Sequence, residues 1–134
     1  KVLLEKEIAC LRNYIELERL RFNDKAAIVL NINAELNGHD LAPLLLLPLV
    51  ENGFKHGLSK QIENSWLKME ISLNKTTLTV IVENSKSVST IPGGKGGIGL
   101  DNLRKRLNLL YPGKHQLTLE DKRNVFLAKL VIEL

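Results

Sequence analysis

The chain has 134 residues, enough for a single domain with its own hydrophobic core. Hydrophobic residues make up 44% of the chain and aromatic residues only 4%, so we expect a globular protein with an aliphatic core. The net charge of +4 is scattered rather than gathered in a basic stripe with stacking aromatics. That distribution argues against a nucleic-acid interface and suits a small anionic ligand or an acidic partner.

The first helix predicted by the pattern covers residues 2–21 and contains the only cysteine, Cys10. A single cysteine excludes an internal disulfide and suits a reducing compartment. No His or other Cys stands near it at the spacing of a metal site, so we expect a buried thiol. The chain begins at Lys1 inside this helical pattern, without a signal peptide, and we expect it to be part of a longer protein.

Periodicity also predicts which faces of this helix are buried and which elements come next. Apolar residues recur at helical spacing, and charged residues such as Glu7 occupy the other faces. The apolar set is Leu4, Ile8, Leu11 and Ile15. Residues 26–36 alternate as in a strand. Pro43 could open the next helix, whereas Pro48 predicts a kink or a later start.

The remainder of the chain reads as two hairpins separated by a loop and a helix. The loop, 84–97, is rich in Ser, Thr, Gly and Lys and is long for a connection, as functional lids often are. The strands are expected at 66–73, 76–82, 116–120 and 125–133, and the helix at 100–111. This order predicts an α+β fold: a two-layer sandwich whose mixed, mostly antiparallel sheet is covered on one face by helices.

The run Glu51–Gly57 places polar side chains in an otherwise apolar helix. Asn52, Lys55 and His56 are spaced to share a helical face, and Glu51 can pair with Lys55. A carboxamide oxygen suits Mg²⁺, and a lysine suits phosphate oxygens. The alternative is a solvated helix end, where Lys55 and His56 are simply favourable. The local pattern leaves both interpretations open.

Two further features point to a ligand without specifying one. Gly97 and Gly99 flank Ile98 where a helix begins, so backbone N–H groups there could approach phosphate. Their spacing matches neither the Walker nor the Rossmann motif, and a lid without a ligand is the alternative. Asn84 ends a strand on the same face as Val82 and could read a base edge, or equally start a turn.

Taken together, the motifs resemble those of the ATP-binding catalytic domain of LytS/YehU-type sensor histidine kinases. This domain belongs to the superfamily that joins gyrase, heat-shock chaperone, histidine kinase and MutL ATPases. Residues 48–57 resemble the N box, P-x-V-E-N-A-x-K-H-G, and residues 97–107 resemble the distal glycine box, G-I-G-L-x-N-x-x-x-R-L. Residues 4–8 and 14–22 resemble the linker helix before the catalytic core. The resemblance covers essentially the whole chain.

The resemblance implies a Bergerat-type fold and a nucleotide site. Asn52 would coordinate Mg²⁺, and Glu51 would hold the position of the superfamily's water-activating acid, here limited to polarising a water or orienting Lys55. Both residues are therefore candidates for a catalytic role. The residues implied to bind ATP are Asn52, Lys55, His56, Asn84, Gly97, Gly99 and Leu100.

The chain departs from the family pattern in two places. Asn84-Ser85-Lys86 stands where the superfamily has D-x-G, so the residue that would accept from the adenine amino group keeps an oxygen but loses its charge. None of the three histidines lies in the phosphoacceptor motif of the family. We therefore expect a chain that binds nucleotide but does not phosphorylate itself.

The main hypothesis is a protein histidine kinase catalytic fragment that presents the γ-phosphate of Mg-ATP to a histidine outside this chain. Residues 1–22 would be a linker from an absent dimerisation and phosphoacceptor segment, and residues 23–134 the ATP-binding domain. The expected partners are those upstream helices, a response regulator and a second copy in the full-length protein, with no nucleic acid. The expected location is the cytoplasmic side of a membrane-anchored bacterial sensor. The alternatives are a degenerate, non-catalytic nucleotide-binding or docking module and, third, ATP hydrolysis of the gyrase type.

Overall fold

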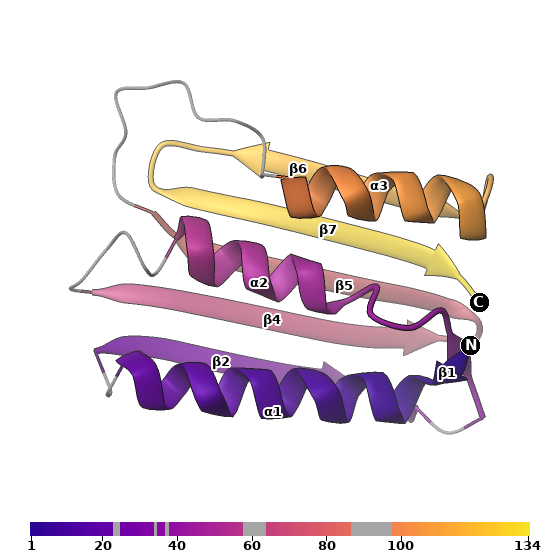
Figure 1. The fold of residues 1–134 in the computed structure, drawn as a ribbon, viewed down its shortest axis with the longest axis horizontal. Coiled ribbons are helices and arrows are strands. Elements are labelled where there is room, and N and C mark those ends of the chain that lie inside the picture. Colours follow the sequence, from indigo (N-terminus) through magenta and orange to yellow (C-terminus); the bar gives the residue numbers. More distant parts are fainter. Residues whose placement is uncertain (23–24, 34, 37, 58–63, 87–97) are drawn as a thin grey trace.

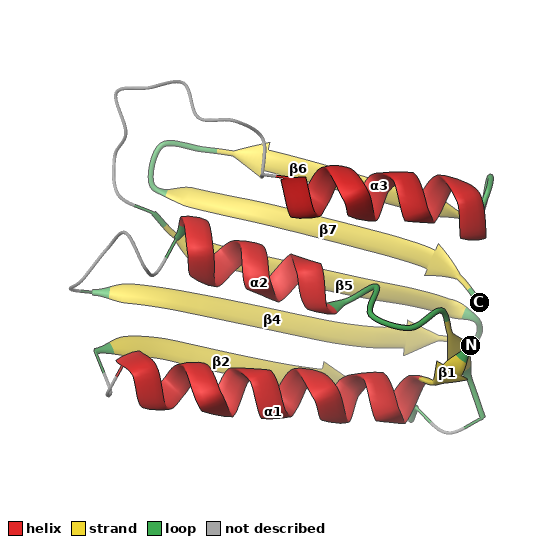
Figure 2. Ribbon diagram, viewed as in Figure 1, coloured by secondary structure: helices red, strands yellow, loops and turns green. Residues whose placement is uncertain are grey.

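A computed structural model describes residues 1–22, 25–33, 35–36, 38–57, 64–86 and 98–134. Within these residues, three helices lie on one face of a five-stranded sheet, which is the predicted two-layer α+β sandwich (Figures 1 and 2). The helices are α1 (Leu4–Phe22), α2 (Leu47–His56) and α3 (Ile98–Leu110). The strands are β1 (Val2–Leu3), β2 (Ala26–Asn33), β3 (Asp40–Leu41), β4 (Ser65–Asn74), β5 (Thr77–Ser85), β6 (His115–Asp121) and β7 (Val125–Glu133).

The large sheet is mixed and mostly antiparallel, as predicted. Its strand order is β2-β4-β5-β7-β6, with β2 parallel to β4 and the other neighbours antiparallel. The β4–β5 hairpin turns at Lys75, whose φ of 57° lies in the left-handed region used by tight hairpin turns. A parallel pair needs a crossover connection, and α2 lies in the one between β2 and β4. The short strands β1 and β3 pair separately.

The core lies between the helices and the inward face of the sheet. Along β4 and β5 every second side chain is buried, which is the period expected of a sheet with one covered face. The predicted apolar stripe of α1 is buried against this face, with exposed fractions between 0% and 3%. Among the described residues, no helix combines the length and the apolar character needed to cross a membrane.

Two side chains of α1 lie differently from the prediction. Cys10 is exposed, so the expected buried thiol is wrong, because the buried stripe runs through Leu11 and Ile15 and leaves Cys10 on the outer side. Glu7 was expected on a polar face but is only 4% exposed. It is covered by the chain segment 42–46, whose backbone it binds. A helical pattern does not reveal such a partner.

The second helix starts late, at Leu47, rather than at Pro43. Pro48 then falls in the first turn, where its missing N–H would have had no partner inside the helix. The later start leaves residues 42–46 as an irregular segment before the helix. Of the two outcomes that Pro48 predicted, the structure has the late start.

Candidate functional site

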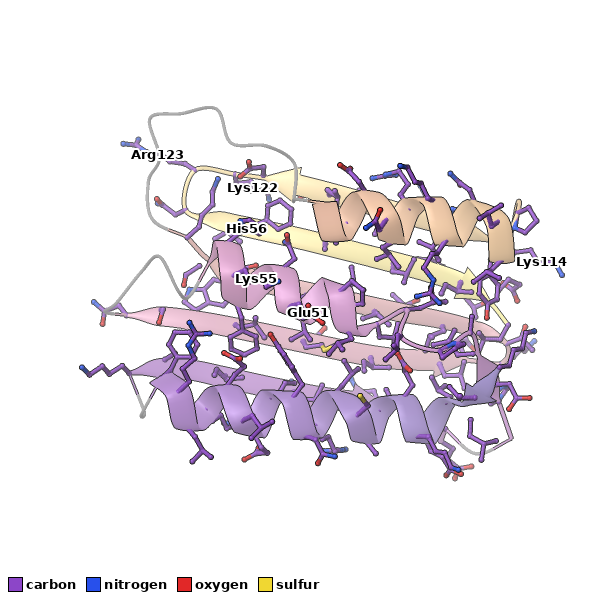
Figure 3. All side chains as sticks on the ribbon, in the orientation of Figure 1. Glu51, Lys55, His56, Lys114, Lys122 and Arg123 are labelled. Atoms are coloured by element: carbon purple, nitrogen blue, oxygen red, sulfur yellow. The ribbon has the colours of Figure 1, made fainter. Side chains whose placement is uncertain are left out.

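The candidate site residues that the structure describes come from α2, the end of β5 and the start of α3. Lys55 and His56 end α2, and Glu51 lies near the middle of that helix. The β6–β7 turn with Lys122 and Arg123 lies at the same end of the molecule as Lys55 and His56 (Figure 3). Asn52 is 8% exposed, on the inner side of α2.

The predicted helical pair on α2 is confirmed. Lys55 Nζ lies 4.0 Å from Glu51 Oε2, at i and i+4. The side chain of Lys55 is 70% exposed and that of Glu51 34%, so the pair adds little to stability. The pair does, however, keep a carboxylate and an ammonium group together at the surface of α2. His56 is also exposed.

Asn84 lies on the inward face of β5, as the strand period predicted, and is only 2% exposed. Its Nδ2 donates to the carbonyl oxygen of Ser85 at 3.0 Å. Its Oδ1 is buried and accepts no hydrogen bond from any described residue. Leaving a buried acceptor unpaired costs about 1–3 kcal/mol. A ligand that donates an N–H to this oxygen would recover that free energy.

Gly53 in α2 and Gly57, which directly follows the helix, let this part of the chain lie directly on Asn84. A Cβ on Gly57 would stand 2.2 Å from Asn84 Nδ2 and 2.7 Å from the carbonyl oxygen of Ser85. A Cβ on Gly53 would stand 3.3 Å from Asn84 Oδ1 and 2.6 Å from Leu67 Cδ1. The carboxamide of Asn84 is therefore held against the backbone of α2. Asn52 directly precedes Gly53 in α2, so it lies next to the part of the helix that contacts Asn84.

The residues after Asn84 fasten the end of β5 to its neighbours. Ser85 Oγ accepts from the N–H of Trp66 at 2.8 Å and donates to the carbonyl oxygen of Trp66 at 3.3 Å, next to the last β4–β5 pair. Lys86, where the superfamily has glycine, forms an ion pair with Asp121, and its N–H donates to the carbonyl oxygen of Asn124 at 3.0 Å. The departure from the D-x-G pattern thus ties β5 to the β6–β7 turn.

The glycine-rich candidates are only partly described. Gly97 and most of the predicted lid, from residue 87 on, lie outside the described residues. Gly99 is in the first turn of α3, and a Cβ there would meet nothing within 4 Å. Leu100 is 2% exposed and belongs to the core. Asn84 is in β5, as the strand period predicted, and Ser85, expected in the loop, is instead the last residue of that strand.

Sequence reasoning missed an aromatic contact between α1 and α2 beside the site. Tyr14 packs edge-on against Phe54, with ring centroids 5.7 Å apart. Burial, followed by the charges of Glu18 and Glu51, raises the pKa of Tyr14 to about 12. The neutral phenol is therefore the stable form next to the carboxylate of Glu51. Tyr14 stands in the sequence within the linker-helix motif, and no local pattern indicates its contact with Phe54.

Comparison with known proteins places these features in a family. No family model matches the chain. The chain is 30% identical over 130 residues to the sensor histidine kinase YpdA of Escherichia coli K12, covering 87% of this chain and 22% of that protein. It is 32% identical over 129 residues to the sensor protein LytS of Streptococcus mutans, covering 87% and 22%. The chain belongs to the LytS-type sensor histidine kinases. It spans about a fifth of the length of these relatives, 22% in both cases.

Solved structures show the same fold for this LytS-type chain. The catalytic domain of the histidine kinase ThkA superposes with a TM-score of 0.69 at 18% identity, covering 98% of this chain and 93% of that domain. A second structure, of ThkA in complex with the response regulator protein TrrA, gives 0.62 at 18% identity, covering 96% and 40%. At this identity the likeness concerns the fold. The superposition includes α1, which packs on the same core as α2 and α3.

Proposed function

We propose that this chain is the ATP-binding catalytic part of a two-component sensor histidine kinase. It would present the γ-phosphate of Mg-ATP to a histidine outside the chain. The observation that carries the proposal is Asn84 Oδ1, a buried acceptor without a partner among the described residues, held against the backbone of α2. Membership of the LytS-type family supports it independently.

The adenine end of the nucleotide fits Asn84. The exocyclic amino group of adenine is a neutral N–H donor, which suits a carboxamide oxygen without a charge. Its hydrogen bond would satisfy Oδ1 while Nδ2 keeps its bond to Ser85. We infer a hydrogen bond weaker than one to a carboxylate, since bonds to charged groups exceed neutral ones by about 1 kcal/mol.

The phosphate end would lie toward the C-terminal half of α2. Asn52 would offer its amide oxygen to Mg²⁺, and Lys55 and His56 would add donors for phosphate oxygens. The described residues contain no group of three or more His, Cys, Asp or Glu able to hold a metal ion, so other ligands would be phosphate oxygens and water. The ion would supply charge neutralisation for phosphoryl transfer. Glu51 would orient Lys55, with which it already pairs.

Gly99 and Leu100 in the first turn of α3, together with Gly97 just before that helix in the sequence, would complete the proposed nucleotide site. Gly97 and Gly99 would provide backbone N–H groups near the phosphates, aided by the helix N-terminus. Leu100 would anchor this end of α3 through its place in the core. Catalysis would then rest on positioning the γ-phosphate rather than on a covalent intermediate.

The rest of the proposal concerns the longer protein. Residues 1–22 would connect the ATP-binding part, 23–134, to upstream helices that carry the phosphoacceptor and dimerise. ThkA, which shares this fold, has been solved with a response regulator, and we propose the same class of partner here. A cytoplasmic position below a membrane anchor would fit a sensor of this type. In the non-catalytic alternative, the chain would bind nucleotide weakly or not at all and would transfer no phosphoryl group.

Thermal unfolding with and without Mg-ATP tests the proposal. A ligand at about 100 times its Kd stabilises the folded state by about 2.7 kcal/mol. For a domain of this size the melting temperature should rise on the order of 10 °C. Asn52→Ala should abolish the rise, whereas Asn108→Ala, at an exposed position of α3, should keep it. A wild-type chain that Mg-ATP never stabilises would leave the proposed function without its chemical basis.

A further inference from the structure

The irregular segment before α2, Ala42–Leu46, is held by side chains from two other helices. Glu7 of α1 accepts from the N–H of Leu44 at 3.1 Å through Oε2, and from the N–H of Leu46 at 3.3 Å through Oε1. Arg106 of α3 donates to the carbonyl oxygen of Leu44 at 3.0 Å and to that of Pro43 at 2.6 Å. The segment is therefore bound from both sides.

A third side chain, from the residue after α3, extends the same arrangement. The hydroxyl oxygen of Tyr111 accepts from the N–H of Ala42 at 3.0 Å, in a buried position. Ala42 itself is 5% exposed. Both ends of the segment thus have their N–H groups bound by side chains that come from far along the chain.

Glu7 binds the N–H group of Leu46, the residue directly before α2, with a side chain that comes from another helix. The residue before α2, Leu46, has no side chain that can cap the helix. The free N–H groups of a helix start need acceptors, and a carboxylate there is favoured by the helix dipole. Glu7 is 4% exposed, so it offers these bonds from inside the core. The residue that precedes α2 is thus held by a side chain of α1.

Leu44 shows that the segment is held in a constrained conformation. Its φ of 58° is in the left-handed region, which is unfavourable for a leucine. Glu7 binds its N–H and Arg106 binds its carbonyl oxygen. A residue keeps such an unfavourable backbone conformation only when contacts with the surrounding structure hold it there. The hydrogen bonds of Glu7 and Arg106 to the backbone of Leu44 are such contacts.

We propose that Glu7 and Arg106 are positioning residues of the nucleotide site. They fix the start of α2 relative to α1 and α3, and Asn52 lies little more than one helical turn further along. Because α2 is a short rigid helix pressed onto Asn84 through Gly57, a shift at its start would move Asn52. The inference rests on the proposed function and deepens it, since it assigns the site two residues that touch no ligand.

The test compares matched substitutions in the 134-residue chain. Glu7→Gln keeps the size of the side chain and one acceptor, and Glu5→Gln is the exposed control on the same helix. Arg106→Met removes both donors, Arg106→Lys restores a single donor, and Lys105→Met is the exposed control. A conservative core change in the sheet, Ile71→Val, provides a variant of lowered stability that leaves the segment untouched.

Two measurements are made on each variant. The first is backbone amide exchange at Leu44 and Leu46, by NMR without nucleotide. We expect exchange at least about tenfold faster in Glu7→Gln, the factor that corresponds to about 1.4 kcal/mol. The second is the Kd of Mg-ATP by calorimetry, which should weaken about tenfold in Glu7→Gln and Arg106→Met. Arg106→Lys should recover part of the affinity, and the double variant should be clearly non-additive.

The outcomes separate this inference from the proposed function. If Glu7→Gln and Arg106→Met bind Mg-ATP as wild type does, Glu7 and Arg106 do not position the site. Equal exchange at Leu44 and Leu46 in Glu7→Gln and Ile71→Val would also overturn the inference, since the effect would then be general loss of stability. A wild-type chain that binds no Mg-ATP would instead overturn the proposed function, and the nucleotide role of both residues with it.

Discussion

Replacing Gly57 with alanine would test how closely α2 lies on the sheet. The new Cβ would stand 2.2 Å from Asn84 Nδ2, 2.6 Å from the carbonyl oxygen of Gly53 and 2.7 Å from that of Ser85. Two of these atoms belong to the backbone and cannot rotate away. To reach an ordinary contact of 3.4 Å from Asn84, the Cβ would have to move about 1.2 Å, the difference between the two distances. Either α2 or Asn84 must shift.

Gly53→Ala is the matched comparison, one turn earlier on the same helix. Its nearest obstacle, at 2.6 Å, is Leu67 Cδ1, the far end of a side chain that can change rotamer. A strained rotamer costs about 0.5–1.5 kcal/mol, and replacing a helical glycine with alanine returns about 1 kcal/mol. The two contributions nearly cancel. For Gly57→Ala no such relief exists, and overpacking should cost about 3 kcal/mol.

Urea and thermal unfolding of the two variants would measure the difference. We expect Gly57→Ala to lower the melting temperature by on the order of 10 °C and Gly53→Ala to change it by only a few degrees, ~3 °C or less. The slope of the urea transition should stay constant, so that the midpoint reports stability. Nucleotide-induced stabilisation should be lost in Gly57→Ala, since Asn84 is displaced. Equal stability of wild type and Gly57→Ala, or a larger loss for Gly53→Ala, would refute the reasoning.

Two other substitutions test the buried side chains of Asn84 and Tyr14. Asn84→Asp replaces the donor to Ser85 with a second buried acceptor, so the nucleotide-free chain should lose about 1–3 kcal/mol, while Mg-ATP should raise its melting temperature more than that of wild type. A rise in the nucleotide-free melting temperature would contradict this. Tyr14 has a pKa raised from 10.0 to about 12, so the folded chain keeps a proton that the unfolded chain releases. The free energy of unfolding should fall as the pH rises from 10 toward 12, and Tyr14→Phe should remove that part of the pH dependence in urea titrations at pH ~9 and ~11. Identical pH profiles for both chains would argue against the burial of Tyr14.

The local pattern of the sequence was sufficient for most of the fold. Strand period predicted the buried face of β5 and therefore the direction of Asn84. Proline rules predicted a kink in α2 or a late start, of which the structure has the late start, and the i, i+4 spacing predicted the pair of Glu51 with Lys55. These features depend on residues a few positions apart, where period and turn chemistry act. The family resemblance rested on motifs of the same local kind.

Contacts between residues far apart in the sequence decided which residues at the edges of the apolar stripe of α1 are buried. Cys10 and Glu7 lie near the edges of the apolar stripe of α1, and only the segment that covers Glu7 makes one buried and leaves the other exposed.

The sequence by itself determined most of the elements, the inward faces of the strands and the motifs of the proposed nucleotide site, because each depends on nearby residues. Tertiary structure alone decided that Gly57 and Asn84 touch, that Lys86 pairs with Asp121 and that Glu7 of α1 binds the residue before α2. Each of these contacts joins residues more than 25 positions apart, and their geometry exists only once the helices pack on the sheet.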